Sequence, residues 1–141
     1  MIRHVILRAL SKLLIPLIML FALYVQFHGD YGPGGGFQAG VIFGAAIILY
    51  ALMFGLGTAK AVFPPRVLQF LVASGVLIYG GTGIAAIFKG GNFLDYSALA
   101  HDPVHGQHLG IFLVELGVGI TVASVMATIF FQFAGRGRSD V

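Results

Sequence analysis

Four long runs of apolar residues dominate the chain, and short polar stretches separate them. A helix needs about 20 mostly apolar residues to cross a hydrocarbon core about 30 Å thick. Strictly alternating apolar and polar positions, which are typical of barrel strands, are absent from the sequence. The pattern therefore predicts an all-α integral membrane protein, with residues 1–141 forming a single domain of four transmembrane helices. The predicted spans run from Val5 to Phe27, Phe37 to Gly57, Val67 to Phe88 and Leu109 to Phe133.

Composition supports this fold class and excludes several functions. The chain of 141 residues is 58% hydrophobic and only 9% charged, whereas a soluble domain carries about 25% charged residues. Cysteine is absent, which rules out disulfides, zinc–thiolate sites, iron–sulfur clusters and cysteine nucleophiles. Facing histidines that could bind haem are not found within the spans, and no nucleophile with a matching base is evident. We therefore expect no cofactor, no metal and no enzymatic activity.

The basic residues predict the orientation of the helices. Lysine and arginine concentrate in cytoplasmic loops, which is the positive-inside rule. Lys89 is the only basic residue on the predicted outer side of the bundle. The other basic residues, which predict that both termini are cytoplasmic, are Arg3, Arg8, Lys12, Lys60, Arg66, Arg136 and Arg138. Because these residues sit at the ends of segments, nucleic acid is not an expected partner.

A glycine-rich stretch, "HGDYGPGGGFQAG" at residues 28–40, lies between the first two spans on the predicted outer side. A phosphate-binding loop is excluded, because no lysine follows the glycines before Lys60. The stretch is typical of a turn in which proline stops the incoming helix and glycines adopt positive φ. It also leads into a helix whose first N–H groups have no helical acceptor. The structural residues of this motif are Pro33, Gly34, Gly35, Gly36 and Phe37.

Two blocks of this sequence resemble those of a known family. "HGDYGPGGGFQAGVI" resembles the motif that opens the second helix in the B subunit of multisubunit Na+/H+ antiporters, the Mrp or Mnh family. "GIFLVELGVGITV", residues 110–122, resembles a second block in which an acidic residue precedes Leu-Gly-Val. Ala39 departs from the pattern, because a glycine is common at that position. The resemblance covers essentially the whole chain and matches its length and number of spans.

This resemblance implies an accessory, multi-pass subunit of a hetero-oligomeric complex in a bacterial or archaeal cell membrane. The complex would exchange sodium ions for protons, and the partners would be large antiporter-like subunits, small membrane subunits and the lipid bilayer. An alternative is a structural or coupling subunit of a related membrane-bound hydrogenase or of an assembly that resembles respiratory complex I. A purely structural scaffold is also compatible with the sequence.

Glu115 is the foremost candidate for ion translocation, because it is an acidic residue within the fourth predicted span. Inserting a charged carboxylate near the membrane centre costs about 2.5–3.5 kcal/mol on translocon scales. It lies two turns below the predicted outer end of its span, or roughly 10 Å. It shares a helix face with Val122 and, less directly, with Gly119, and we expect that face to pack on another helix. Two roles stay open, a proton or sodium relay and a buried structural acid.

Lys12 and His108 are the other two candidates for ion translocation. Lys12 shares a helix face with Arg8 and lies deeper in the first span, where it either lines a polar cavity or extends to the interface. His108 precedes the fourth span and lies above Glu115, on a possible path from the outer water. Metal binding by His108 and its neighbours His101, Asp102 and His105 is not expected, since Pro103 and Gly106 should break any helix there and leave a solvated loop.

The predicted topology can be tested by cysteine labelling, because the native chain has no cysteine. Arg136→Cys should stay unlabelled when a membrane-impermeant thiol reagent is added outside intact cells, whereas Asn92→Cys in the predicted outer connection should react. Labelling of Arg136→Cys from outside would overturn the cytoplasmic placement of the C-terminus.

Overall fold

A computed structural model describes residues 2–28, 35–99 and 102–136. It contains helices and no strand within those ranges. Four of these helices are long and apolar enough to cross a membrane, which confirms the predicted fold class. The elements are α1 (Ile2–Phe27), α2 (Gly36–Phe54), α3 (Leu56–Val62), α4 (Pro65–Phe88), the 3₁₀ helix η1 (Tyr96–Leu99) and α5 (Pro103–Ala134).

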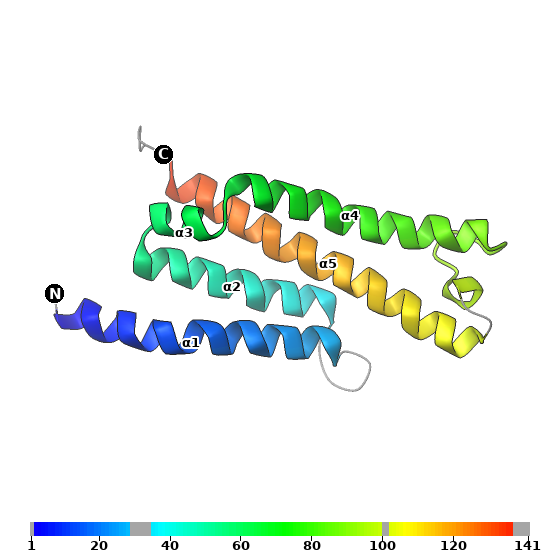
Figure 1. Cartoon of the computed structure of the whole chain (residues 1–141), viewed down its shortest axis with the longest axis horizontal. Coiled ribbons are helices and arrows are strands. Elements are labelled where there is room, and N and C mark those ends of the chain that lie inside the picture. Colours follow the sequence, from blue (N-terminus) through cyan, green and yellow to red (C-terminus); the bar gives the residue numbers. More distant parts are fainter. Residues whose placement is uncertain (1, 29–34, 100–101, 137–141) are drawn as a thin grey trace.

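The four long helices lie side by side in the spatial order α1, α2, α5, α4 (Figure 1). The beginning of α1 and the end of α5 lie at the same end of the bundle. This arrangement agrees with the expectation that both termini share one side of the membrane. Which side that is remains a prediction from the basic residues.

The second span is shorter than predicted and is followed by an extra short helix. Gly55 has a φ of 97° and separates α2 from α3. A side chain is strongly disfavoured at this φ, so glycine allows the chain to turn there. Leu56 and Ala59 of α3 then pack with Leu68 and Phe131 in a buried apolar cluster at this end of the bundle. Pro65 starts α4, where proline is favoured because the first helical residue needs no N–H donor.

The fourth spanning helix starts at Pro103 rather than Leu109. The expectation that Pro103 and Gly106 would break a helix is therefore wrong. Pro103 is the first residue of the helix, where its missing N–H does no harm. The Asp102 side chain caps the helix by accepting a hydrogen bond of 3.0 Å from the Val104 backbone N–H.

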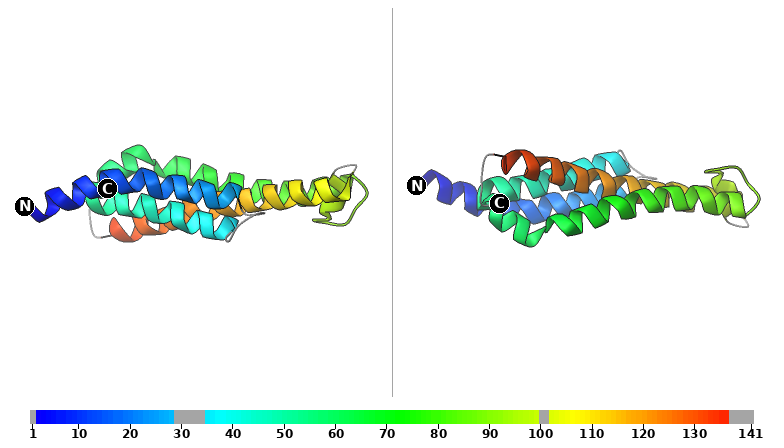
Figure 2. Two further views of the ribbon diagram at one scale, coloured as in Figure 1. Left: turned by 90° about the horizontal axis from the view of Figure 1, so that it is seen from below. Right: turned by 90° about the horizontal axis from the view of Figure 1, so that it is seen from above.

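The connection between α4 and α5 is folded, not simply a solvated loop. It contains η1, and the ring of Tyr96 packs directly against Gly110 of α5. The Lys89 Nζ donates a hydrogen bond of 3.0 Å to the backbone oxygen of Leu99. With this connection, α4 and α5 extend beyond the ends of α1 and α2 (Figure 2).

Glycines set the distance between α2 and α5. Gly36, Gly40 and Gly44 recur every four residues and face α5, and we call this contact the glycine seam. A β-carbon on Gly40 would lie 2.7 Å from the backbone oxygen of Gly119 and 2.8 Å from Cβ of Val122. In lipid, such close backbone approach provides the van der Waals contact that holds helices together.

The glycine seam predicts a large difference between two glycine-to-alanine substitutions. Gly40→Ala should lower the free energy of unfolding by about 1–3 kcal/mol, because the added methyl group meets the α5 backbone. Gly80→Ala in α4 is the matched control, since nothing lies within 4 Å of its β-position. Thermal unfolding of the purified chain in detergent would measure both. Equal stability of the two variants would contradict the role of the seam.

Candidate functional site

Glu115 lies against the first residues of α2. A β-carbon on Gly35, the residue that caps α2, would lie 3.0 Å from Oε1 of Glu115. A β-carbon on Gly36 would overlap with the backbone oxygen of Glu115. The helix face predicted for Glu115 is therefore confirmed as a packing face. The glycine-rich block and the acidic block, far apart in the sequence, meet at this point.

Gly35 is restricted by a neighbouring side chain and not by its backbone conformation. Its φ is −144° and its ψ is −161°, an extended conformation that any residue can adopt. The expectation of a positive φ at Gly35 is therefore wrong. What restricts this position is the close approach of Glu115. Pro33 and Gly34 lie outside the described residues, and Phe37 is 60% exposed on the outside of this chain.

The start of α2 is electrostatically suited to a carboxylate. The Gly35 N–H donates a hydrogen bond of 2.9 Å to Oε1 of Gln38, while the first N–H groups of the helix have no helical acceptor. The N–H groups after Gly35 place partial positive charge at this end of the helix. A carboxylate there gains about 0.3–1 kcal/mol at an exposed site and up to ~2 kcal/mol when partly buried. Glu115 is half-buried at this position.

Glu115 lies farther from the start of its helix than the sequence predicts, because α5 begins before the predicted span. More than three turns of α5 precede Glu115, a length of ~18 Å. Gly36, its contact, is the first residue of α2, whose 19 residues measure ~28 Å and so just match the hydrocarbon core. Glu115 therefore lies level with the first turn of α2, and the part of α5 before Glu115 extends beyond that end of α2.

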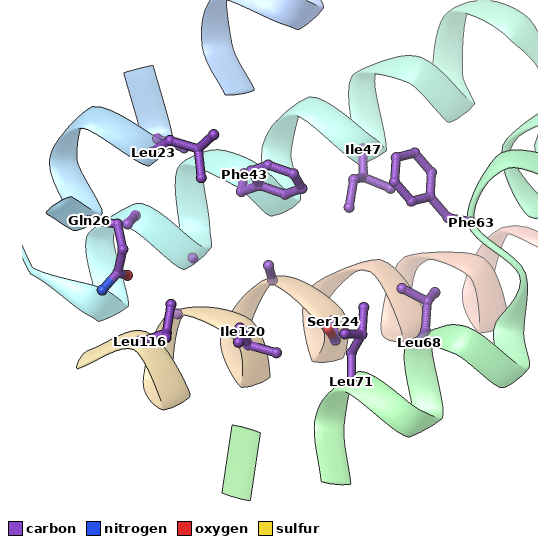
Figure 3. Close-up of a pocket in the computed structure, with 15 residues that line it drawn as sticks. Leu23, Gln26, Phe43, Ile47, Phe63, Leu68, Leu71, Leu116, Ile120 and Ser124 are labelled. Carbon is purple, nitrogen blue, oxygen red and sulfur yellow. The ribbon is translucent and has the colours of Figure 1, made fainter. Parts of the chain in front are cut away.

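Gln26 is a further polar residue at this position that the sequence analysis missed. It lies near the end of α1 and is 6% exposed. A β-carbon on Gly119, one turn after Glu115, would lie 2.5 Å from Oε1 of Gln26 and 3.3 Å from the backbone oxygen of Gly36. Figure 3 shows the Gln26 amide beside the start of α2, facing α5. The feature of the sequence that could have identified Gln26 is a glutamine side chain inside an otherwise apolar predicted span.

Comparison with known proteins identifies the family. The family model described as "Domain related to MnhB subunit of Na+/H+ antiporter" matches residues 6–128. The chain belongs to this family. It is also 36% identical over 138 residues to "Putative antiporter subunit mnhB2" of Staphylococcus haemolyticus strain JCSC1435, covering 96% of each chain. The protein of the same name from Staphylococcus aureus strain Newman has the same identity and coverage.

In this MnhB-related chain, Lys12 lies far from Glu115. The Lys12 Nζ lies 5.9 Å from the ring centroid of Phe54, and the guanidinium carbon of Arg8 lies 5.4 Å from the same centroid. Phe54 ends α2, whereas Glu115 contacts its beginning, ~27 Å away along the helix. Both cations therefore lie at the opposite end of the bundle, beside one half-buried aromatic ring.

His108 lies between Glu115 and the start of α5. It is exposed and precedes Glu115 by about two turns, or ~10 Å. It therefore lies in the part of α5 that extends past α2. His105 is also on α5, and its Nδ1 lies 3.8 Å from Oδ2 of Asp102. Among the described residues, which do not include His101, no three His, Asp or Glu side chains are placed to hold a metal.

Alanine at Gly35 and at Gly36 should have different consequences. At Gly36 the added methyl group meets the fixed backbone of Glu115, so Gly36→Ala should separate α2 from α5 and lower the yield of assembled complex. At Gly35 it meets the end of a side chain that can move, so Gly35→Ala should preserve assembly while displacing the carboxylate. Co-purification of the complex measures assembly, and ion flux in vesicles measures function. Equal assembly of the two variants would contradict this assignment.

Proposed function

We propose that this chain is an accessory subunit of a multisubunit sodium/proton antiporter in a bacterial or archaeal cell membrane. Its partners are the large antiporter-like subunits and the other small membrane subunits, and the whole chain acts as one membrane domain. Membership of the MnhB-related family supports the proposal, as do the names of the relatives that the chain matches over nearly its full length. The proposal assigns no chemical reaction to the chain.

The contact between Glu115 and the start of α2 is the observation that supports a role for Glu115 in transport. The two sequence blocks that resemble the family meet there, although more than 70 positions separate Gly36 from Glu115 in the sequence. In this proposal Glu115 takes up and releases a proton near the outer boundary of the membrane. Peptide dipoles at the start of α2 reduce the cost of its charge.

His108 and Lys12 have different places in this proposal. His108 lies on the outer side of Glu115 along α5 and is exposed, so it can exchange protons with outer water on the way to Glu115. Lys12 lies at the other end of the bundle with Arg8 and Phe54, and its proposed contribution is limited to that end.

The competing proposal is that Glu115 has a purely structural role. The packing of Gly36 on the Glu115 backbone supports this role as well as it supports proton transfer. In that case, the carboxylate would only anchor α5 to α2 or to a neighbouring subunit. The two functions differ in whether assembly or transport depends on the carboxyl group.

Glu115→Gln separates these two functions, because it retains the shape of the side chain and removes its titration. If Glu115 carries protons, the complex should assemble normally, while sodium-dependent proton flux in membrane vesicles falls about 10²-fold or more, the usual contribution of a proton-transfer group. Glu115→Asp should retain part of the flux, since the carboxyl group stays and only its reach shortens. Co-purification of the sibling subunits measures assembly in the same membranes.

Asp102→Asn is the matched control, since it removes a carboxylate from the same helix. Asparagine caps a helix as well as aspartate does, so this variant should keep both assembly and flux. Loss of the complex in Glu115→Gln would favour the structural anchor. Normal assembly with unchanged flux and unchanged pH profile would exclude both roles for Glu115.

A further inference from the structure

The side-chain amide nitrogen of Gln26 is buried and has no hydrogen-bond partner among the described residues. An unsatisfied donor in an apolar environment is costly, because it has given up its hydrogen bonds to water. Native proteins usually satisfy such a group with a partner side chain or with an ordered water molecule. The buried amide nitrogen of Gln26 therefore needs a hydrogen-bond acceptor.

Gln26 lies at one end of a cavity of about 220 Å³ between the four long helices. Leucine, isoleucine and phenylalanine side chains make up most of its lining, and Gln26 and Ser124 are its polar side chains. Gln26 and Leu116 lie at one end, whereas Phe63 and Leu68 lie at the other (Figure 3). The polar end is the one next to Glu115, since Leu116 follows Glu115 directly on α5.

Several oxygen atoms surround the point at which Gln26 meets α5. The backbone oxygen of Gly36 and Oε1 of Gln26 both lie close to the β-position of Gly119. Residue 115 lies one turn before Gly119, a rise of ~6 Å along α5, and its Oε1 lies against Gly35, the neighbour of Gly36. A buried water molecule is held by two to four polar partners. The Gln26 end of the cavity therefore has a donor with oxygen atoms nearby, and Ser124 is the polar side chain of the lining toward Leu68 and Leu71.

We propose that Gln26 holds a water molecule at the junction of α1, α2 and α5, and that this water is hydrogen-bonded to the carboxyl group of Glu115. The Gln26 amide nitrogen donates to the water oxygen. The two O–H groups of the water then donate to oxygen acceptors, one of which is the Glu115 carboxylate. A sodium ion does not fit the unsatisfied atom, because an N–H donor cannot coordinate a cation.

The water also gives Glu115 a route for proton exchange, and this part rests on the proposed function. A hydronium ion that reaches the site transfers one proton to the carboxylate, which leaves a neutral water molecule and a neutral carboxylic acid. The reverse step returns the proton to the water. Gln26 does not exchange a proton in either step and is a positioning residue.

Infrared difference spectroscopy of the purified complex, recorded between two pH values, can detect this water directly. A hydrogen-bonded O–H stretching band should appear and should shift when the sample is transferred to H₂¹⁸O. The band should be absent in Gln26→Met, whose side chain has the same length but no donor, and the Glu115 carboxyl band should shift in that variant. Gln26→Leu is a second apolar replacement, so that poor assembly of one variant does not prevent the test.

Gln69→Leu is the control, because it removes an exposed amide from α4 away from the junction. This variant should keep the isotope-sensitive band. Gln26→Met should assemble normally, since an apolar group of similar shape fits an apolar cavity. An unchanged O–H band and an unchanged carboxyl band in both Gln26 variants would overturn the water site.

Proton flux tests the second part of the proposal separately. Gln26→Met should lower sodium-dependent proton flux about tenfold, which is less than the 10²-fold or greater effect expected of a direct proton-transfer group. The double variant Gln26→Met/Glu115→Gln should be no slower than Glu115→Gln alone, because both residues act in one step. Lost bands with unchanged flux would retain the water site and overturn its role in proton exchange. Additive losses would also overturn that role.

Discussion

The close approach of Gly36 to the backbone of Glu115 is the contact on which the rest of this structure depends. No side chain fits between the two helices there, so the first turn of α2 and the middle of α5 are fixed against each other. Gly40 and Gly44 extend the same contact along α2, which holds the two helices in register. Because lipid offers no hydrophobic force between helices, this packing must supply the association energy. The positions of Gln26 and of the cavity follow from that register.

The register also determines where the charged group lies in the membrane. A carboxylate on a helix longer than the membrane thickness can lie at any depth in the membrane. Its depth is inferred from the shorter helix that it contacts, here α2. α2 has 19 residues, about the length that a span needs, so its two ends can reach the two boundaries of a hydrocarbon core. α5 has 32 residues and extends past the start of α2, with η1 and Tyr96 packed against its extension. Glu115 therefore lies level with one end of the shortest spanning helix, and a charge near the end of a span costs less than one at the bilayer centre.

The sequence was sufficient for the four spanning helices, since uninterrupted apolar runs of this length are typical of membrane-crossing helices. It also indicated the packing face of Glu115, because helical periodicity places Gly119 and Val122 on the same side. The sequence did not predict correctly where all of the helices begin and end. Pro103 was expected to stop a helix, but it starts one. The decisive feature is the Asp102 side chain, which caps the helix by accepting a hydrogen bond from the Val104 N–H. The break at Gly55 depends on a single positive φ, which many glycines could adopt but few do.

The candidate site was harder to predict than the fold, because its members come from three helices and only Glu115 carries a charge. Gln26 is an uncharged residue in the first span, and nothing in its local sequence distinguishes a lipid-facing amide from one at a helix junction. Lys12 was also a candidate, yet it lies at the opposite end of α2, near Phe54. The grouping that emerges combines a carboxylate with peptide dipoles and a neutral amide. Peptide dipoles at the start of a helix stabilise the charged form of a carboxylate. They reach Glu115 only because Gly35 and Gly36 let α2 approach α5 closely.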